Sequence, residues 1–216
     1  MKYRLVVFDW DGTIMDSTGL IAECIQLAAN DCGLMPPSTE AAKHIIGLGI
    51  LDSTRMLFPY LDAAGLQQFA QRYRAHYVPR DGEVRLYEGI ETVLSDLAQA
   101  ERFLAVATGK PRRGLDLAFA NCGLLPHFHF TRCADEGFPK PHPDMLEKLM
   151  SFACVDADET LMIGDTTHDL EMAAAAGCDA LGVSYGAHHP EKLLSSPHRA
   201  VLSNVTALND WLNTHG

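Results

Sequence analysis

Two aspartates at the end of a short apolar segment form the first pattern with chemical meaning. Asp9 and Asp11 follow residues 4–8 directly, and Gly12 and Thr13 come next. An apolar run that ends in polar residues and glycine is typical of a buried strand followed by a tight loop. Two carboxylates this close repel each other unless a cation lies between them, and Mg²⁺ prefers carboxylate oxygens. The pattern therefore predicts a divalent-cation site at the end of this strand.

Polar residues also follow two other segments that have the composition of buried strands. Thr108 follows residues 103–107, and Asp165 follows residues 160–164. Helical patterns lie between these segments, and the alternation of strands with helices predicts a doubly wound parallel sheet. Ligands bind at the carboxyl ends of the strands in such sheets, so we expect Thr108 and Asp165 to share one edge with Asp9.

The hydrophobic pattern predicts the remaining elements. Further strands are expected at residues 128–131, 180–183 and 200–202. Helices are expected from near Thr13–Asp16 to about 32, at 41–46, 51–57, 63–77, 88–97 and 111–122, with Pro143 in the first turn of another, after Asp165 to about 176, and near 207–212. Thr13 and Asp16 have the spacing of a capping box, which predicts that the first helix begins beside them. Only helical patterns occur between Gly12 and Gly82, which indicates an all-helical insertion in the sheet domain.

The strand-end residues, with Lys140 and Asp169 added, are the set that phosphoryl transfer requires. A carboxylate can attack phosphorus, while a metal ion and a lysine neutralise the charge that spreads over the phosphoryl oxygens. Two assignments stay open at this point. Asp169 lies three residues after Thr166, so it either binds the metal or caps a helix, and Thr108 either holds a phosphoryl oxygen or caps the following helix.

Four motifs in this order resemble the phosphatases of the haloacid dehalogenase superfamily, and most of all the phosphoglycolate-phosphatase-like members. The motifs are Asp9-Trp10-Asp11-Gly12-Thr13, Ala107-Thr108-Gly109, Lys140-Pro141 and Gly164-Asp165-Thr166-Thr167-His168-Asp169. The resemblance implies a Rossmann-like core domain of residues 1–16 and 83–216. It also implies a helical cap domain of residues 17–82, inserted after the first motif, whose loop at residues 46–50 either faces the site or only separates two cap helices.

The resemblance also implies a role for each motif residue. Asp9 is expected to be the nucleophile and a Mg²⁺ ligand, and Asp11 the general acid/base, with its main-chain carbonyl on the metal. Thr108 and the Gly109 N–H are expected to hold phosphoryl oxygens. The remaining expected roles are Lys140 as a bridge between Asp9 and the phosphate, Asp165 as a metal ligand, and Asp169 as a direct or water-mediated metal ligand.

Other polar residues near the motifs are interpreted as structural. Lys110 stands before a proline, where a lysine is usually solvated. His168, His142 and the pair His188-His189 are expected at the surface or in turns rather than in catalysis.

Composition restricts the partners. The 216 residues carry a formal net charge of -11, with a pI of about 5.2, which disfavours nucleic acid and anionic lipid. The six cysteines have no zinc-ligand spacing, and no apolar run reaches the length of a membrane span. The expected protein is cytoplasmic, a monomer or homodimer, and its partner is a small phosphorylated metabolite.

Three functions fit these features. The first is a Mg²⁺-dependent phosphatase that hydrolyses a small phosphomonoester, phosphoglycolate-like or a sugar phosphate, through an aspartyl phosphate. A phosphosugar mutase of the same superfamily would use the same core. A regulatory protein that only binds Mg²⁺ or phosphate belongs to a different class, and the complete motif set argues against it.

Overall fold

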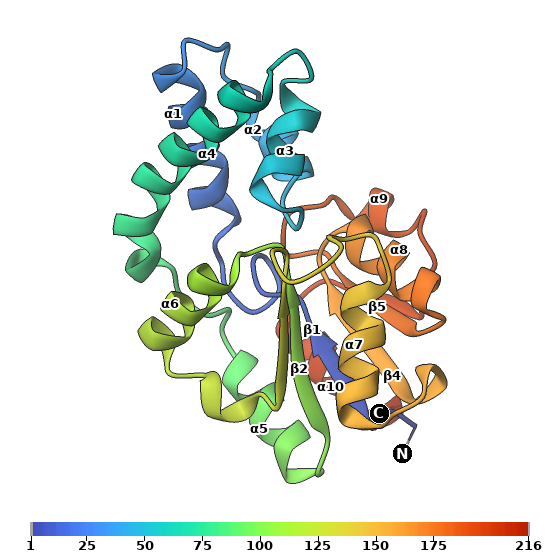
Figure 1. The fold of residues 1–216 in the computed structure, drawn as a ribbon. Coiled ribbons are helices and arrows are strands. Elements are labelled where there is room, and N and C mark those ends of the chain that lie inside the picture. Colours follow the sequence, from blue (N-terminus) through green and yellow to red (C-terminus); the bar gives the residue numbers. More distant parts are fainter. Residues whose placement is uncertain (1, 216) are drawn as a thin grey trace.

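A six-stranded parallel sheet forms the centre of the molecule, in a computed structural model that describes residues 2–215 (Figure 1). Its strands are β1 (Leu5–Phe8), β2 (Phe103–Thr108), β3 (Phe130–Cys133), β4 (Thr160–Gly164), β5 (Asp179–Val183) and β6 (Ala200–Leu202). They lie in the order β3-β2-β1-β4-β5-β6, with every pair parallel. The predicted doubly wound parallel sheet is confirmed.

Helices cover both faces of this sheet. The helices α5 (Ile90–Gln99), α6 (Arg112–Cys122) and α10 (Val205–His215) lie on one face, and α7 (Asp144–Ala153), α8 (Thr167–Ala176) and α9 (Pro190–Leu193) lie on the other. Val6 and Phe8 pack against the first group, whereas Leu5 and Val7 pack against the second. Both sides of β1 are therefore buried, which explains its unbroken apolar sequence.

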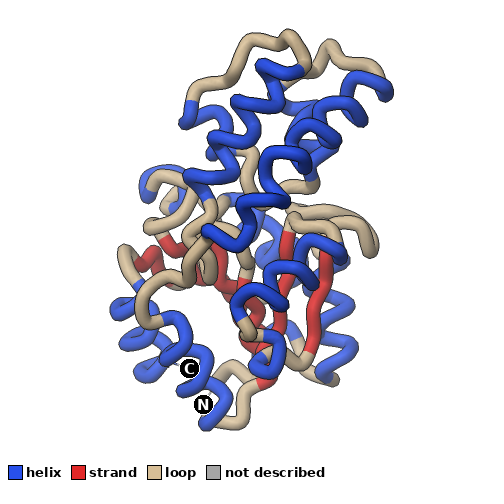
Figure 2. Tube along the Cα trace, turned by 90° about the vertical axis from the view of Figure 1, so that its left-hand side faces the viewer, coloured by secondary structure: helices blue, strands red, loops and turns tan. Residues whose placement is uncertain are grey.

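The predicted helical insertion lies above the carboxyl edge of the sheet, between β1 and β2 in the chain. Its helices are α1 (Thr18–Asp31), α2 (Thr39–His44), α3 (Ile50–Leu57) and α4 (Ala63–Tyr77). They bury a hydrophobic cluster of their own, and Figure 2 shows them as a separate group over the strands. Three short 3₁₀ helices, η1 (Val78–Glu83), η2 (Leu125–His127) and η3 (Ala157–Glu159), complete the elements. The domain limits at residues 17–82 stay a prediction, and residues 1 and 216 of the predicted core lie outside the described chain.

The prediction for the start of the first helix is wrong. The backbone from Asp11 to Met15 forms a tight loop, in which the Gly12 N–H donates to the Met15 carbonyl at 2.8 Å. Thr13 donates its hydroxyl to the Asp165 carboxylate at 3.1 Å instead of capping a helix. A buried acceptor from a distant strand therefore outcompetes the local capping box, and α1 begins only at Thr18.

Across residues 2–215, none of the helices combines the length and apolar character that crossing a bilayer requires. The cytoplasmic location stays a prediction.

Candidate active site

The sheet register places three of the predicted site residues at one edge. Phe8 of β1 lies opposite Val106 of β2 and Ile163 of β4. Asp9 is the next residue along, and its N–H donates to the Ile163 carbonyl at 2.8 Å. Thr108 ends β2 and Asp165 directly follows β4. Both residues therefore lie beside Asp9.

Asp9, Asp165 and Asp169 form a buried carboxylate cluster with Lys140, which we call the Lys140 cluster. Each of the three acids offers an oxygen within 4.8 Å of the other two. Lys140 Nζ lies 2.8 Å from Asp9 Oδ1 and 2.6 Å from Asp169 Oδ1, and the lysine side chain is fully buried. Lys140 therefore contacts Asp9 directly, and its expected bridge to a phosphoryl group stays a prediction.

Burial and mutual repulsion raise the proton affinity of this cluster. Desolvation raises the pKa of Asp9 to about 7, although Lys140 opposes it, and it raises the pKa of Asp165 well above the usual range. Burial would lower the pKa of Lys140, but Asp169 and Asp9 outweigh it, so its pKa is raised. The cluster brings three carboxyl groups together with one ammonium, so full ionisation would leave two negative charges without a partner there.

A second observation also indicates that the Lys140 cluster can bind a divalent cation. Both carboxylate oxygens of Asp9 are buried and accept no hydrogen bond of good geometry from residues 2–215. Lys140 approaches one of them as an ion pair, but its hydrogen bond goes to Asp169. Buried acceptors without donors are rare in native structures, and a hard cation is the ligand that such oxygens prefer.

Two glycines keep the surroundings of Asp165 open. Gly12 has a φ of +83°, and a Cβ at either Gly12 or Gly186 would collide with the Asp165 carboxylate. The acid itself is held by the Thr13 hydroxyl at 3.1 Å and by the Ala187 N–H at 2.6 Å. Asp165 is therefore fixed in one orientation by groups from two separate segments, the loop after β1 and the loop after β5.

Asp169 performs a structural function as well as facing the cluster. Its Oδ2 accepts hydrogen bonds from the Thr166 N–H at 3.1 Å and the Thr166 hydroxyl at 2.7 Å, in the capping box at the start of α8. Its Oδ1 accepts from Lys140. The two interpretations that the sequence left open are therefore compatible, because each uses a different oxygen.

Asp11 lies in a second buried cluster, the Lys110 cluster. Asp11 Oδ1 accepts a hydrogen bond from the Ser17 hydroxyl at 2.7 Å and lies 3.1 Å from Lys110 Nζ. Lys110 also donates to the Tyr77 hydroxyl at 2.9 Å and lies 4.0 Å from Asp81 Oδ1. The expectation of a solvated Lys110 is wrong, because this side chain is only 9% exposed.

The sequence contained one signal that Lys110 lies near the site, and no signal for its partners Tyr77 and Asp81. Lys110 stands two residues after Thr108, so a site at Thr108 implied that Lys110 lay nearby. Tyr77 and Asp81 reach the site only through the path of α4 and η1, which local sequence does not specify.

The loop before α3 lies directly over the strand ends. A Cβ at Gly109 would lie 2.5 Å from the Gly47 carbonyl oxygen and 2.8 Å from that of Leu48. A Cβ at Gly47 would lie 3.2 Å from Thr166 Oγ1. Of the two interpretations of this loop, the structure supports the one in which it faces the site.

Thr108 is fully buried at the end of β2, and its hydroxyl oxygen accepts the Lys110 N–H at 3.1 Å. The hydroxyl proton remains available to donate to a phosphoryl oxygen. Thr108 shapes the loop after β2 rather than capping α6, whose N-cap residue is Pro111.

The histidine prediction is half right. His142 and His189 are exposed, as expected, but His168 and His188 are buried under the cap. Their Nε2 atoms lie 3.4 Å and 2.9 Å from the His44 carbonyl oxygen of α2. These two histidines therefore form contacts between cap and core.

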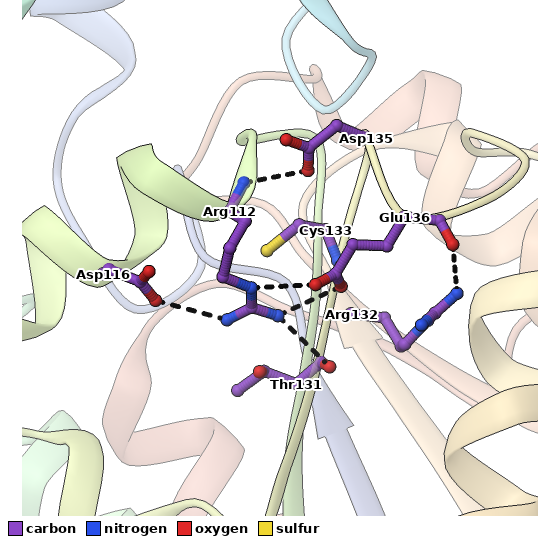
Figure 3. A network of polar contacts seen from close by, with 7 residues as sticks. All are labelled: Arg112, Asp116, Thr131, Arg132, Cys133, Asp135 and Glu136. Atoms are coloured by element: carbon purple, nitrogen blue, oxygen red, sulfur yellow. Dashed lines mark hydrogen bonds and ion pairs between the residues drawn. The ribbon is translucent and has the colours of Figure 1, made fainter.

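A polar network links the start of α6 to the loop that precedes Lys140 (Figure 3). Arg112 donates to both carboxylate oxygens of Glu136, at 2.9 Å and 3.0 Å. Glu136 also accepts the Cys133 N–H at 2.9 Å, and Arg132 donates to the Glu136 carbonyl. Bidentate pairs of this kind have a defined geometry, so the network fixes the loop between the segments of Lys110 and Lys140.

Comparison with known proteins agrees with the fold and with the family that the motifs resemble. Residues 6–183 match the family model of haloacid dehalogenase-like hydrolases. The Dickeya dadantii protein named "Probable phosphatase IndB" is 31% identical over 208 residues, which are 94% of this chain and 90% of that protein. The phosphoglycolate phosphatase of Aliivibrio fischeri is 31% identical over 89% of each chain. A hydrolase from Pseudomonas syringae is only 17% identical but superposes over 100% of both chains with a TM-score of 0.91, which supports the fold alone.

Proposed function

The chain belongs to the haloacid dehalogenase-like hydrolase family, and we propose that it is a Mg²⁺-dependent phosphatase acting on a small phosphomonoester. The observation that carries the proposal is the Asp9 carboxylate. It is buried, accepts no hydrogen bond from the described residues, and lies 2.8 Å from a buried lysine. A carboxylate in this state is unsolvated and paired with a cation, as a nucleophile toward phosphorus requires.

Asp9, Asp165 and Asp169, with the main-chain carbonyl of Asp11, would hold the Mg²⁺ ion. When bound, the ion would supply positive charge to the phosphoryl oxygens and to Asp9. Lys140 would add a fixed positive charge from the core side.

The chain's own residues would carry out the remaining chemistry in two steps. Asp9 attacks phosphorus to form an aspartyl phosphate, while the Thr108 hydroxyl and the Gly109 N–H hold the phosphoryl oxygens. Asp11 gives its proton to the leaving oxygen as the P–O bond breaks. Asp11 then accepts a proton from the water that attacks the phosphorus and releases Asp9.

The cap supports a small substrate. The loop at Gly47 and Leu48 contacts Gly109, and the buried His168 and His188 contact α2, so the strand ends are covered. A covered site excludes water and admits a metabolite more readily than a protein. The Aliivibrio fischeri relative is named a phosphoglycolate phosphatase, which makes phosphoglycolate and sugar phosphates the first candidates.

The test is phosphate release from a panel of phosphorylated metabolites with Mg²⁺, by the wild type and by Asp9→Asn. We expect Asp9→Asn to reduce turnover at least about 10⁴-fold, because the substituted amide is not a nucleophile. Asp158→Asn is the matched control, since this exposed aspartate in η3 lies in neither cluster. Turnover that survives in a pure sample of Asp9→Asn would exclude the mechanism.

The same panel separates the alternatives. A phosphosugar mutase would form an isomeric sugar phosphate without net phosphate release. A regulatory protein would bind Mg²⁺ or phosphate but hydrolyse no substrate, including p-nitrophenyl phosphate.

A further inference from the structure

We propose that Lys110 is a positioning residue which, together with Ser17, determines the oxygen of Asp11 that carries the transferred proton. The proposal rests on the proposed function, because it assumes that Asp11 is the general acid/base. Lys110 and Ser17 occupy Asp11 Oδ1, so the proton resides on Oδ2 and passes from there to the leaving oxygen as the P–O bond breaks.

The argument begins with the two oxygens of Asp11, which have different surroundings. Oδ1 accepts from the Ser17 hydroxyl at 2.7 Å and lies 3.1 Å from Lys110 Nζ. Among the described residues, no donor forms a hydrogen bond with Oδ2. An oxygen that faces two donors, one of them charged, is a poor location for a proton. A protonated Asp11 therefore places its proton on Oδ2.

Lys110 is itself held in place by groups on other segments. Its ammonium donates to the Tyr77 hydroxyl at 2.9 Å and lies 4.5 Å from the centre of the Tyr77 ring. Asp81 Oδ1 lies 4.0 Å away, and Asp81 Oδ2 accepts a hydrogen bond from Asn121 at 2.9 Å. One hydrogen bond to Tyr77 and two ion pairs thus hold the ammonium in place beside Asp11.

Ser17 is available for this function because it does not cap α1. It is the N-cap residue, but its side chain forms no capping hydrogen bond. Its hydroxyl donates to Asp11 at 2.7 Å and lies 3.4 Å from the Met15 carbonyl. Removing this hydroxyl therefore affects Asp11 without removing a helix cap.

Leaving-group dependence distinguishes this role from a merely structural one. Departure of an alkoxide requires a proton from Asp11, whereas 2,4-dinitrophenolate is stable enough to leave without one. We compare kcat/KM for the best alkyl phosphomonoester of the panel, with phosphoglycolate tried first, and for 2,4-dinitrophenyl phosphate. The ratio kcat/KM covers the steps up to phosphoryl transfer, so it omits the later hydrolysis of the aspartyl phosphate.

For Lys110→Met we expect kcat/KM to fall about 10–100-fold on the alkyl substrate and less than about threefold on the dinitrophenyl substrate. Ser17→Ala should shift the ratio in the same direction by a smaller factor. The matched control is Lys148→Met, since this lysine is exposed on α7 and should leave both values unchanged.

Lys110→Met removes the cation beside two buried acids and can impair folding. The double variant Lys110→Met with Asp81→Asn removes one of these acids and should restore the melting temperature while keeping the altered substrate ratio. Equal losses on both substrates, or no loss on either, would overturn the positioning role. A wild type that hydrolyses neither substrate would instead overturn the proposed function, so the two failures are distinguishable.

Discussion

Two buried lysines face the candidate site, and they are organised differently. Among residues 2–215 the polar partners of the Lys140 ammonium are two carboxylates, Asp9 at 2.8 Å and Asp169 at 2.6 Å, and its side chain is fully buried. Lys110 lies farther from its acids, at 3.1 Å from Asp11 and 4.0 Å from Asp81. Lys110 also donates to the Tyr77 hydroxyl and lies over the Tyr77 ring, and its side chain is 9% exposed.

The difference lies in which parts of the molecule each lysine joins. Both partners of Lys140 are core residues beside the sheet, whereas Lys110 joins Asp11 to Asp81 in η1, the segment that leads from the cap back to the core. Lys140 therefore balances charge within the core. Lys110 connects the residue expected to move protons with the base of the cap, so the two lysines should fail in different ways when replaced.

The largest expected effect comes from replacing each lysine by methionine. Lys140→Met should lower kcat at least about 10³-fold on every substrate, because it removes a charge that contacts the nucleophile. Lys110→Met should lower kcat/KM much less, and only for poor leaving groups. Steady-state kinetics on one alkyl and one dinitrophenyl substrate, with Lys148→Met as the control, measures both. Indistinguishable profiles for the two variants would remove the distinction between the clusters.

Replacing Gly186 should weaken the metal site and spare the Lys110 cluster. In Gly186→Ala the added Cβ would collide with the Asp165 carboxylate and with the Gly12 carbonyl. We expect the Mg²⁺ concentration for half-maximal activity to rise about 10–100-fold, because changes to the groups that orient a metal ligand typically weaken metal binding by this factor. The preference between alkyl and dinitrophenyl substrates should stay unchanged. Gly19→Ala is the control, since nothing lies within 4 Å of its Cβ position.

The sequence was sufficient for the sheet and the helical insertion, because hydrophobic periodicity is a local signal. Local signals placed Asp9 and Asp165 at strand ends, but the role of Lys140 came from the order of the four motifs, since Lys110 also precedes a proline. The Lys110 cluster could not be predicted in this way. Tyr77 and Asp81 come from the end of the insertion, and their meeting with Lys110 depends on how the cap packs on the core.

Thr13 illustrates the same limit at a single residue. It has a valid capping-box partner in Asp16, yet it donates to Asp165, which lies 152 residues away in the chain. The local spacing predicts that its hydroxyl oxygen accepts a helix N–H, whereas tertiary packing makes the hydroxyl a donor to Asp165. The errors for Lys110, His168 and His188 arise in the same way, because burial under the cap depends on packing that no local pattern encodes.

The excess negative charge of the Lys140 cluster predicts a pH effect on the metal-free protein. Asp9 and Asp165 have raised pKa values in the folded state, so the folded state binds protons that the unfolded state has lost. Stability should therefore fall as the pH rises from about 4 towards 7 and above. We expect the melting temperature in EDTA to be several degrees lower at pH 8 than at pH 5, and Mg²⁺ to reduce this difference. A melting temperature that rises over this interval without metal would show that the carboxylates are not in excess.

The smallest expected effect concerns the network that joins the two lysine segments (Figure 3). Glu136→Gln keeps the shape of the side chain but weakens the bidentate contact with Arg112, which leads into α6 just after Lys110. We expect a loss of about 1 kcal/mol, or roughly 2–4 °C in melting temperature, with kcat/KM reduced about two- to fivefold.

Both clusters should respond to this change, because the loop of Glu136 lies between them in the chain. The Ala134 N–H donates to the Lys110 carbonyl at 3.0 Å, and the same loop continues to Lys140. The loss of kcat/KM should therefore be similar for alkyl and dinitrophenyl substrates, unlike the selective loss in Lys110→Met. Glu147→Gln, on the exposed side of α7, is the control. A selective loss in Glu136→Gln would mean that the network supports Lys110 alone, and that Lys140 is held by its two carboxylates without help from the loop.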